Sequence, residues 1–183
     1  MTTFQLHDSE TAPEDAKPIL EQSRQAFGMI PNLHAVLAES PQTFQAYNTL
    51  HELFTKTSFN NDEITVVWQT INVDHECHYC VPAHTAIAKQ MGVSEAISQA
   101  LRDETPLPDD RLEALRTFTK QMIAKRGNVD KADLDAFFSA GYGQQQVLEV
   151  ILGLAQKTIS NYVNHIAETP LDQPFQPLAW QRT

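Results

Sequence analysis

Apolar residues recur at the three- and four-residue spacing of amphipathic helices along nearly the whole chain. Together with capping residues and glycine or proline stops, the spacing predicts helices at about 13–27, 31–39, 41–54, 61–73, 77–91, 93–102, 112–123, 130–140 and 144–168. No pair of alternating segments suggests neighbouring strands. We therefore expect an all-α fold in a single domain over residues 1–183, with an extended lead-in at 1–12 and a proline-rich tail at 169–183.

The segment at 61–73 is ambiguous, because many of its residues are β-branched and would suit a strand. Its apolar positions nevertheless follow the i, i+3, i+4, i+7 spacing of one helix face. Asn60 can cap such a helix, and Glu63, three residues later, completes a capping box. We therefore predict a helix that opens with an acidic residue.

The predicted helix at 144–168 carries the broadest apolar stripe of the chain. Its members are Val147, Leu148, Ile151, Leu154, Ala155, Thr158, Ile159, Tyr162, Val163 and Ile166. A stripe this wide implies deep burial or a contact with another subunit. Because one small domain does not need to cover so much apolar surface, we expect a homo-oligomer.

Charge and composition narrow the functional classes. The 183 residues carry a formal net charge of −10 without a cluster of lysine and arginine, which argues against a nucleic-acid partner. The chain does not start with a basic stretch followed by an apolar run, and no apolar run approaches the roughly 18 residues that span a membrane. We expect a soluble, cytoplasmic protein without a membrane partner.

Both cysteines of the protein lie in one short motif, Cys77-x-x-Cys80, and His84 follows four residues later. On a helix these three side chains would fall within about 60° of one another. The N-terminal end of a helix favours the thiolate, and a histidine one turn away can accept or donate a proton. In a reducing compartment such a pair is more often catalytic or metal-binding than a structural disulfide. The motif therefore predicts redox or thiol chemistry.

Two other interpretations of the motif remain open. The cysteines could be small buried residues, or they could bind zinc with His84 and one of His75 or His78. Structural zinc sites usually take their second pair of ligands from a distant segment, and four ligands on one turn are crowded. We therefore favour thiol chemistry and assign no metal and no cofactor.

The motif, on a helix that follows an apolar helix opening with an acid, resembles the alkylhydroperoxidase D-like (AhpD-like) and carboxymuconolactone decarboxylase-like family. The segments at 27–32 and 164–172 are similar to parts of its larger members. The resemblance implies an AhpD-like multi-helix domain that forms symmetric oligomers, with C-x-x-C at the N-terminus of a central helix. It also implies a peroxidase that reduces small hydroperoxides, is re-reduced by a dithiol or protein-thiol partner, and needs no flavin, haem or metal.

The same resemblance implies roles for individual residues. Cys80 would attack the peroxide, and Cys77 would resolve the resulting sulfenic acid as a disulfide. His84 would relay protons, with Glu63 as the relay acid.

Glu63 departs from the family pattern by two positions. In the best-described members this acid lies at the position of Thr65. If the two helices form an antiparallel hairpin that turns near residue 75, residue 63 lies opposite residues 84–88. We therefore expect its carboxylate to reach His84.

Other residues and other functions stay open at this point. Tyr79, where the best-described enzyme has a histidine, either lines a pocket or packs, and Asn161 and His165 can face the cysteines from the last helix. The protein could be a redox-responsive or thiol-binding module on the same fold without significant turnover. It could also be a carboxymuconolactone decarboxylase-like enzyme, although members with that chemistry generally lack the cysteine pair.

Overall fold

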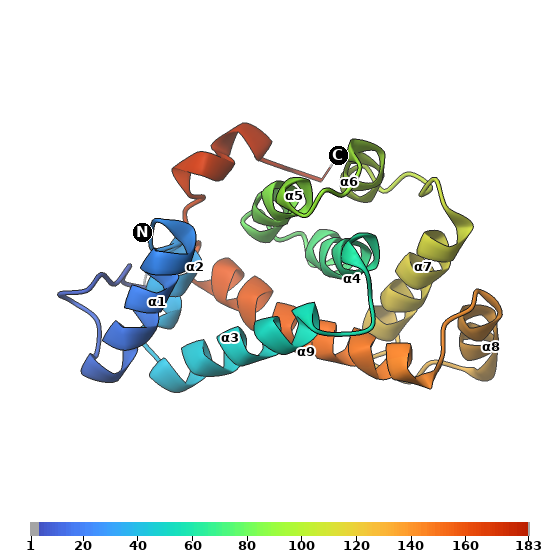
Figure 1. Cartoon of the computed structure of the whole chain (residues 1–183), viewed down its shortest axis with the longest axis horizontal. Helices are drawn as coiled ribbons and strands as arrows, with labels where there is room; N and C mark the ends of the chain where they lie inside the picture. The colour runs from blue at the N-terminus through green and yellow to red at the C-terminus, as the bar shows by residue number, and fades with distance from the viewer. Residues whose placement is uncertain (1–3, 183) are drawn as a thin grey trace.

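The computed structural model describes residues 4–182, so the first three residues of the predicted lead-in and the last residue of the tail lie outside it. Its elements are the 3-10 turn η1 (Glu14–Ala16), α1 (Lys17–Phe27), α2 (Asn32–Leu37), α3 (Pro41–Thr55), α4 (Asn61–Asp74), α5 (Cys80–Gln90), α6 (Glu95–Arg102), α7 (Asp110–Ala124), α8 (Lys131–Ser139), α9 (Gln144–Ile166) and the 3-10 segment η2 (Gln173–Leu178) (Figure 1). No strand occurs in residues 4–182, and the all-α prediction is confirmed. Among the described helices none combines the length and the apolar character needed to cross a bilayer.

Capping residues set the start of α4 as the sequence predicts. The side chain of Asn60 accepts a hydrogen bond from the N–H of Glu63 (3.0 Å), and the Glu63 carboxylate accepts one from the N–H of Asn60 (2.9 Å). Every residue from 63 to 73 is buried. Burial of all faces of the segment therefore overrides the strand preference of its β-branched residues, and the predicted helix is confirmed.

The helix that carries the cysteines begins later than predicted. Glu76 has a left-handed backbone (φ 52°) and turns the chain after α4. The N–H of Cys77 donates to the carbonyl of Asn72 (2.9 Å), and the carbonyl of Cys77 accepts from the N–H of Val81 (3.1 Å). Cys77 therefore lies in the turn between α4 and α5, whereas Cys80 is the first residue of α5.

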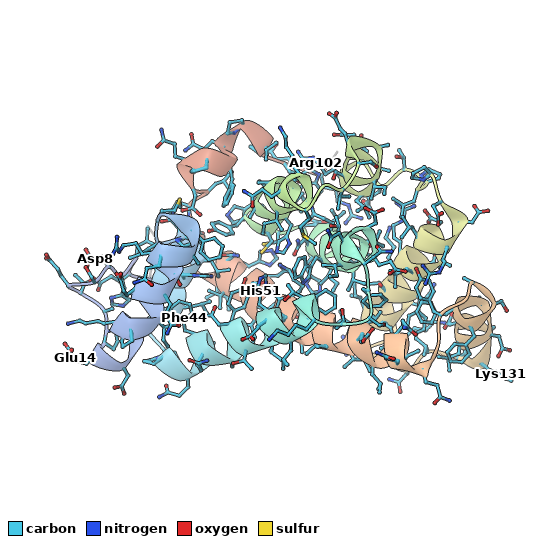
Figure 2. All side chains as sticks on the ribbon, in the orientation of Figure 1. Asp8, Glu14, Phe44, His51, Arg102 and Lys131 are labelled. Atoms are coloured by element: carbon cyan, nitrogen blue, oxygen red, sulfur yellow. The ribbon has the colours of Figure 1, made fainter. Side chains whose placement is uncertain are left out.

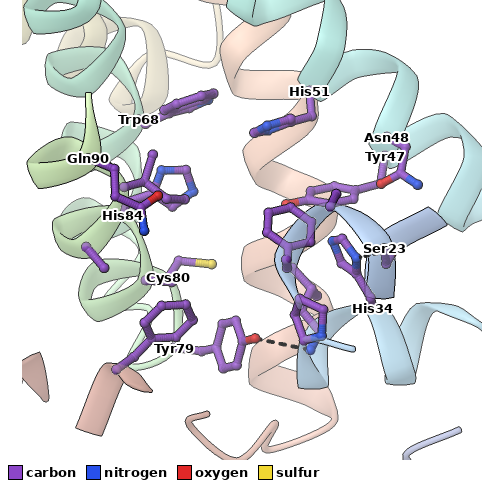
Figure 3. Close-up of a pocket in the computed structure, with 18 of the residues that line it drawn as sticks. Ser23, His34, Tyr47, Asn48, His51, Trp68, Tyr79, Cys80, His84 and Gln90 are labelled. Carbon is purple, nitrogen blue, oxygen red and sulfur yellow. Dashed lines mark hydrogen bonds between the residues drawn. The ribbon is translucent and has the colours of Figure 1, made fainter. Parts of the chain in front are cut away.

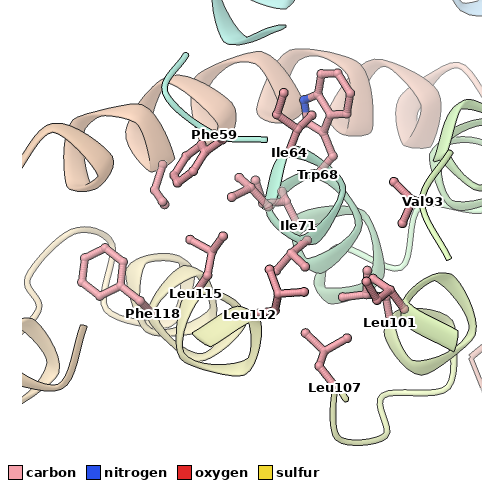
Figure 4. Packing of buried hydrophobic residues seen from close by; sticks show 14 of the residues in the cluster. Phe59, Ile64, Trp68, Ile71, Val93, Leu101, Leu107, Leu112, Leu115 and Phe118 are labelled. Atoms are coloured by element: carbon pink, nitrogen blue, oxygen red, sulfur yellow. The ribbon is translucent and has the colours of Figure 1, made fainter. Parts of the chain in front are cut away.

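Helix α4 lies at the centre of the molecule (Figure 1). It packs against α5, α6, α7 and α9, while α3 runs alongside α9. One hydrophobic cluster joins α4 to α6, α7 and α8 (Figure 4), and a second joins α1, α2 and α3 to the cysteine segment. Side chains fill the space between the helices (Figure 2). The cysteines therefore lie at the inner edge of the second cluster, next to the central helix.

The most deeply buried face of α9 is largely polar. Its buried residues are Val150, Gly153, Gln156, Lys157, Ser160, Asn161 and Asn164. The sequence predicts deep burial or a subunit contact for the apolar stripe, and four of its members are exposed in the single chain: Leu148 (67%), Ile151 (45%), Tyr162 (54%) and Ile166 (65%). A polar face can be buried where its groups find hydrogen-bond partners, and the partners here lie in the cysteine segment and in α4.

Candidate functional site

The two cysteines are free thiols and almost completely buried, with exposed fractions of 0% for Cys77 and 2% for Cys80. The turn before α5 brings Cys77 back to the start of the helix, where the N–H of Cys80 donates to Cys77 Sγ (3.3 Å). His84, one helical turn after Cys80, is buried as well. The structure therefore brings three of the four predicted site residues to the N-terminal end of α5.

Helix α9 supplies polar groups to the thiols. Asn164 Nδ2 donates to Cys80 Sγ (3.2 Å) and lies 4.0 Å from Cys77 Sγ. Ser160 and Lys157 lie on the same buried face of α9 and also favour the charged form of Cys80. Donors of this kind stabilise a thiolate more than a thiol, because negative charge on the acceptor strengthens each hydrogen bond.

The same contacts give the two thiols different acidities. Burial raises the pKa of Cys80, but the hydrogen bond from Cys77, the charge of Lys157 and the hydrogen bonds from α9 outweigh burial and lower that pKa to about 5. The pKa of Cys77 is raised, because its hydrogen bond to Cys80 favours the protonated form and burial adds to the effect. At neutral pH Cys80 is therefore the thiolate and Cys77 keeps its proton.

Lys157 is fully buried, and its Nζ lies 2.8 Å from Nε2 of His84. Burial, the charge of Lys157 and the nearby His51 lower the pKa of His84 well below its usual value, so the neutral imidazole accepts this hydrogen bond. Burial also lowers the pKa of Lys157, while the negative charge of Cys80 opposes that shift. The ammonium and the thiolate therefore compensate each other's charge in the interior.

Glu63 does not join this group. Its carboxylate accepts hydrogen bonds from Arg111 and from the N–H of Asn60, at the start of α4. The group that contacts the imidazole of His84 is Lys157, on a different helix. The structure therefore does not place the predicted relay acid beside the predicted relay base.

The register of the α4–α5 hairpin explains the position of Glu63. The two helices do run antiparallel, with Gln69 Nε2 donating to Thr85 Oγ1 (3.1 Å). Near the other end, Asn61 Nδ2 donates to the carbonyl of Met91 (2.9 Å). Glu63 is therefore level with the last turn of α5, whereas His84 lies nearer the start of that helix.

The neighbouring histidines have other partners. His75 Nδ1 is hydrogen-bonded to Asn161 Oδ1 (2.9 Å), His78 Nε2 donates to the carbonyl of Thr169 (3.0 Å), and His165 is exposed. Across residues 4–182 no group of three or more histidine, cysteine, aspartate and glutamate side chains is arranged to hold a metal ion. The ligand set considered for zinc is therefore not assembled.

Tyr79 connects the cysteine segment to distant parts of the chain. Its hydroxyl donates to Asp172 and accepts from the N–H of Leu33 (3.3 Å). The carboxylate of Asp172 also accepts from the N–H of Asn32 (3.1 Å), the first residue of α2. Tyr79 therefore both packs and lines the cavity described next.

A cavity of about 530 Å³ adjoins the site (Figure 3). Cys80, His84 and Lys157 line it, whereas Cys77 is not part of its wall in the described structure. The remaining wall is mainly apolar and aromatic and includes Phe27, Leu33, Tyr47, Trp68, Ile87 and Phe175. The volume lies within the range of small-molecule sites. A molecule in the cavity would therefore meet the sulfur of Cys80 and not that of Cys77.

No protein-family model and no curated protein matches the sequence. Solved structures do match. An uncharacterized peroxidase-related protein from Ralstonia eutropha JMP134, described as an alkylhydroperoxidase AhpD core, superposes with a TM-score of 0.79, over 95% of this chain and 94% of its own, at 19% identity. The chain has the AhpD fold.

Two further structures share the AhpD fold with this chain. A peroxidase-related protein from Silicibacter sp. TM1040 has a TM-score of 0.78 and 16% identity, over 94% of this chain and 92% of its own. The debrominase Bmp8, as a cysteine-to-alanine variant in complex with 2,3,4-tribromopyrrole, has a TM-score of 0.76 and 14% identity, over 97% of this chain and 95% of its own. The AhpD-like fold expected from the motif is therefore confirmed.

The sequence analysis named Asn161 and His165 of the last helix but missed Lys157, Ser160 and Asn164; Asn161 contacts His75 and Asn72, and Asn164 contacts Cys80. Lys157, Ser160, Asn161 and Asn164 are polar residues at i, i+3, i+4 and i+7, and this spacing marks one face of a helix. Lys157 is also the single lysine, arginine or acidic residue between positions 149 and 168. A polar stripe on an otherwise apolar helix was the signal for these residues.

Proposed function

We propose that the protein is a thiol-dependent peroxidase that reduces organic hydroperoxides through a dithiol–disulfide cycle of Cys80 and Cys77. The observation that carries the proposal is the position of Cys80, which lines the cavity beside a buried cation and adjoins a second, protonated thiol. Fold likeness to peroxidase-related proteins agrees with this chemistry but does not define it.

The chemistry follows from the two thiol states. The Cys80 thiolate attacks the terminal peroxide oxygen, the O–O bond breaks, and the electron pair leaves with the alkoxide, which takes up a proton to give the alcohol. Cys80 is then a sulfenic acid. The Cys77 sulfur attacks it, an S–S bond forms, and water leaves. A dithiol or protein-thiol reductant returns the disulfide to two thiols, as a reducing compartment such as the cytoplasm permits.

We assign the proton of the first step to Lys157 instead of Glu63. When the thiolate attacks, its negative charge moves to the leaving alkoxide, and the buried ammonium loses the anion that stabilised it. A buried ammonium without a counter-ion is a stronger acid, so Lys157 releases its proton as the alkoxide forms. Lys157 lines the cavity and can give this proton to the alkoxide directly, while Nε2 of His84 accepts a hydrogen bond from the Lys157 amine and holds it in position.

The test is a thiol count before and after one equivalent of cumene hydroperoxide, followed by steady-state turnover with dithiothreitol. The parent protein should lose both thiols together and consume peroxide continuously. Cys77→Ser should stop after one turnover and leave a sulfenic acid that dimedone labels, whereas Cys80→Ser should be inactive. A Cys80→Ser protein as fast as the parent would falsify the proposal, and a disulfide that forms without turnover would favour a redox-responsive module.

The likeness to a debrominase supports a second candidate. In reductive debromination the Cys80 thiolate would take bromine from carbon, the carbanion would gain a proton, and Cys77 would displace bromide to give the same disulfide. Bromide release from 2,3,4-tribromopyrrole, measured with the same reductant, separates this reaction from peroxide reduction. Bromide release without peroxide consumption would replace the first candidate with the second.

We also propose that a second copy of the chain covers the outer α9 stripe, which consists of Leu148, Ile151, Tyr162 and Ile166. These residues are largely exposed on one helix, at successive spacings of three, eleven and four residues that keep them on one face. The expected homo-oligomer would bury them while leaving the polar face of α9 with the thiols.

A further inference from the structure

One wall of the cavity is a continuous row of rings. His51 stacks on Trp68 with ring centroids 5.2 Å apart and an interplanar angle of 2°. Tyr47 lies 6.3 Å from His51 and 5.8 Å from His34, and Phe27 lies 5.6 Å from His34. All five residues line the cavity. In Figure 3 the ring of His51 and the sulfur of Cys80 point into the same space from opposite sides.

A chain of hydrogen bonds fixes which nitrogen of His51 carries the proton. The indole N–H of Trp68 can only donate, so its partner at 2.6 Å is the carbonyl oxygen of Gln156. The amide nitrogen of Gln156 then donates to Nδ1 of His51 (3.2 Å). Because Nδ1 accepts, the proton of the neutral imidazole is on Nε2. Within residues 4–182 this Nε2–H has no partner.

His34 has the opposite tautomer. The hydroxyl of Ser23 donates to the carbonyl of Ile19 (3.1 Å), so it accepts a hydrogen bond from Nδ1 of His34 (2.8 Å). The proton is therefore on Nδ1, and Nε2 of His34 keeps a lone pair that no described residue uses. Nδ1 of His84 is a fully buried atom without a hydrogen-bond partner. Nε2 of His34 and Nε2 of His51 are not fully buried, so a molecule in the cavity can contact them. The wall thus offers one free donor and one free acceptor.

Both imidazoles are uncharged at neutral pH. Burial and the nearby His51 lower the pKa of His34 to about 3, and burial and the charge of Lys157 lower the pKa of His51 to about 4. The Cys80 thiolate already balances the charge of Lys157 on the other side of the cavity. The cavity therefore offers a carboxylate no net positive charge, and an ionic ligand would lose its hydration without compensation.

We propose that the ring wall selects a neutral, ring-bearing organic substrate, whose polar group accepts a hydrogen bond from His51 or donates one to His34. The volume agrees, because a cavity of about 150 Å³ already holds benzene and this one has about 530 Å³. That the bound molecule is the substrate of Cys80 rests on the proposed function. Recognition by the wall does not depend on turnover.

The test is the affinity of the reduced parent protein, which keeps the Cys80 thiolate opposite Lys157, for three inert molecules, measured by titration calorimetry at neutral pH. Cumyl alcohol has a ring and a hydroxyl, cumene has the ring alone, and phenylacetate is an anion. Cumyl alcohol should bind roughly three- to ten-fold more tightly than cumene, the effect of one hydrogen bond, and at least about ten-fold more tightly than phenylacetate. If phenylacetate binds as tightly as cumyl alcohol or more tightly, the proposal is wrong, and no substitution in the wall is needed to show it.

Two variants locate the polar contact. His51→Phe and His34→Phe keep a ring in place and remove the free donor or the free acceptor. At least one of the two variants should lower the affinity for cumyl alcohol to that for cumene, while the affinity for cumene changes by less than about two-fold. His165→Phe, at an exposed histidine of α9, is the matched control and should change neither affinity. Unchanged affinity for cumyl alcohol in both wall variants contradicts the proposal.

The outcome is separable from that of the proposed function. If cumyl alcohol binds as expected but no hydroperoxide is consumed, the wall is confirmed as a binding site and the peroxidase proposal fails. If hydroperoxides are consumed but hydrogen peroxide is turned over as efficiently as cumene hydroperoxide and cumyl alcohol does not bind, the peroxidase stands and the inference about the wall fails.

Discussion

The proposed chemistry depends on Lys157 and the Cys80 thiolate, because neither charge would be stable in the interior alone. An unpaired buried charge costs several kcal/mol, and a group in that position usually becomes neutral instead. The hydrogen bond from Asn164 adds to the stabilisation of the thiolate, but Asn164 carries no charge. The acidity of Cys80 should therefore depend mainly on Lys157 and on the neighbouring thiol.

Replacing Lys157 with methionine tests this dependence. In the parent the lowered pKa of about 5 leaves Cys80 ionised above that pH, so its alkylation rate should be flat from pH 6 to 8 and fall below pH 5. Without the cation, burial raises the pKa past the ordinary value near 8.5, and the profile should move up by roughly three pH units or more. The measurement is the rate of reaction with iodoacetamide across this range.

Methionine is close in volume to lysine and apolar, so the variant should fold, and the neutral thiol needs no counter-ion. Lys89→Met, at an exposed lysine of α5, is the control and should keep the parent profile. If Lys157→Met also keeps the parent profile, the ammonium is not the counter-ion of Cys80.

Glu63→Gln separates a catalytic role of this residue from a structural one. Because the carboxylate binds Arg111 and caps α4, we expect the variant to lose about 1–2 kcal/mol of unfolding free energy in urea. Peroxide turnover and the alkylation profile of Cys80 should stay within about two-fold of the parent. Glu95→Gln, at an exposed first-turn acid of α6, should change neither quantity. A loss of turnover with unchanged stability would return Glu63 to the proton relay.

Local spacing explains why some site residues could be predicted and others could not. Cys77, Cys80 and His84 lie within eight positions, so their neighbourhood follows from the motif alone. Lys157 and Asn164 are more than seventy positions away, and only the packing of α9 brings them to the thiols. Glu63 was misplaced because one turn of register between two helices cannot be read from their sequences.

At the scale of elements, the apolar pattern was enough to predict helix α4 but not to predict what surrounds each face of α9. Helix α4 was predicted correctly because its capping box and its spacing agree, and full burial explains its β-branched residues. The sequence shows the apolar stripe of α9 but leaves open whether the core or another subunit covers it, and the structure leaves part of the stripe exposed. A pattern shows which residues share a face, whereas the environment of that face depends on the neighbours. Here the inward neighbours are thiols and amides, which favour the polar face.

At Gly153, helix α9 lies in close contact with α3 and α4. A Cβ atom there would lie 2.8 Å from Cε2 of Phe54 and 2.9 Å from Cγ1 of Val67, and both side chains are completely buried. Alanine normally stabilises a helix by about 1 kcal/mol relative to glycine. We expect Gly153→Ala to reverse this sign, because overpacking of about 1–3 kcal/mol outweighs the gain.

The prediction is a lower unfolding free energy of Gly153→Ala in urea, by about 1–2 kcal/mol. Gly143→Ala, before the first turn of the same helix, is the control. There the Cβ would lie 3.4 Å from Oε1 of Gln146 and the backbone is extended, so the change should stay below about 1 kcal/mol. A Gly153→Ala protein more stable than the parent would mean that the three helices can separate at little cost.

At the scale of the whole molecule, α9 has two faces of different character. Its polar face supplies the donors of the thiol site, while the outer α9 stripe is directed away from the core. An apolar row along a helix of 23 residues, about 34 Å long, is more than isolated surface residues need to explain. Association of two copies along this row would hold α9 straight and so keep Lys157 and Asn164 in position against Cys80.

The double substitution Leu148→Lys and Ile166→Lys tests this arrangement, because two lysines facing their copies would repel and remove apolar contact at both ends. We expect the parent to sediment as an oligomer at micromolar concentration and the variant to shift to the monomer mass. Leu53→Lys, at a 50% exposed leucine of α3, should keep the parent mass.

If the monomeric variant keeps the alkylation profile of Cys80, the thiol site is complete in one chain. If the profile moves to higher pH, assembly positions the donors of α9. A parent that sediments as a monomer would leave the outer α9 stripe without the proposed partner.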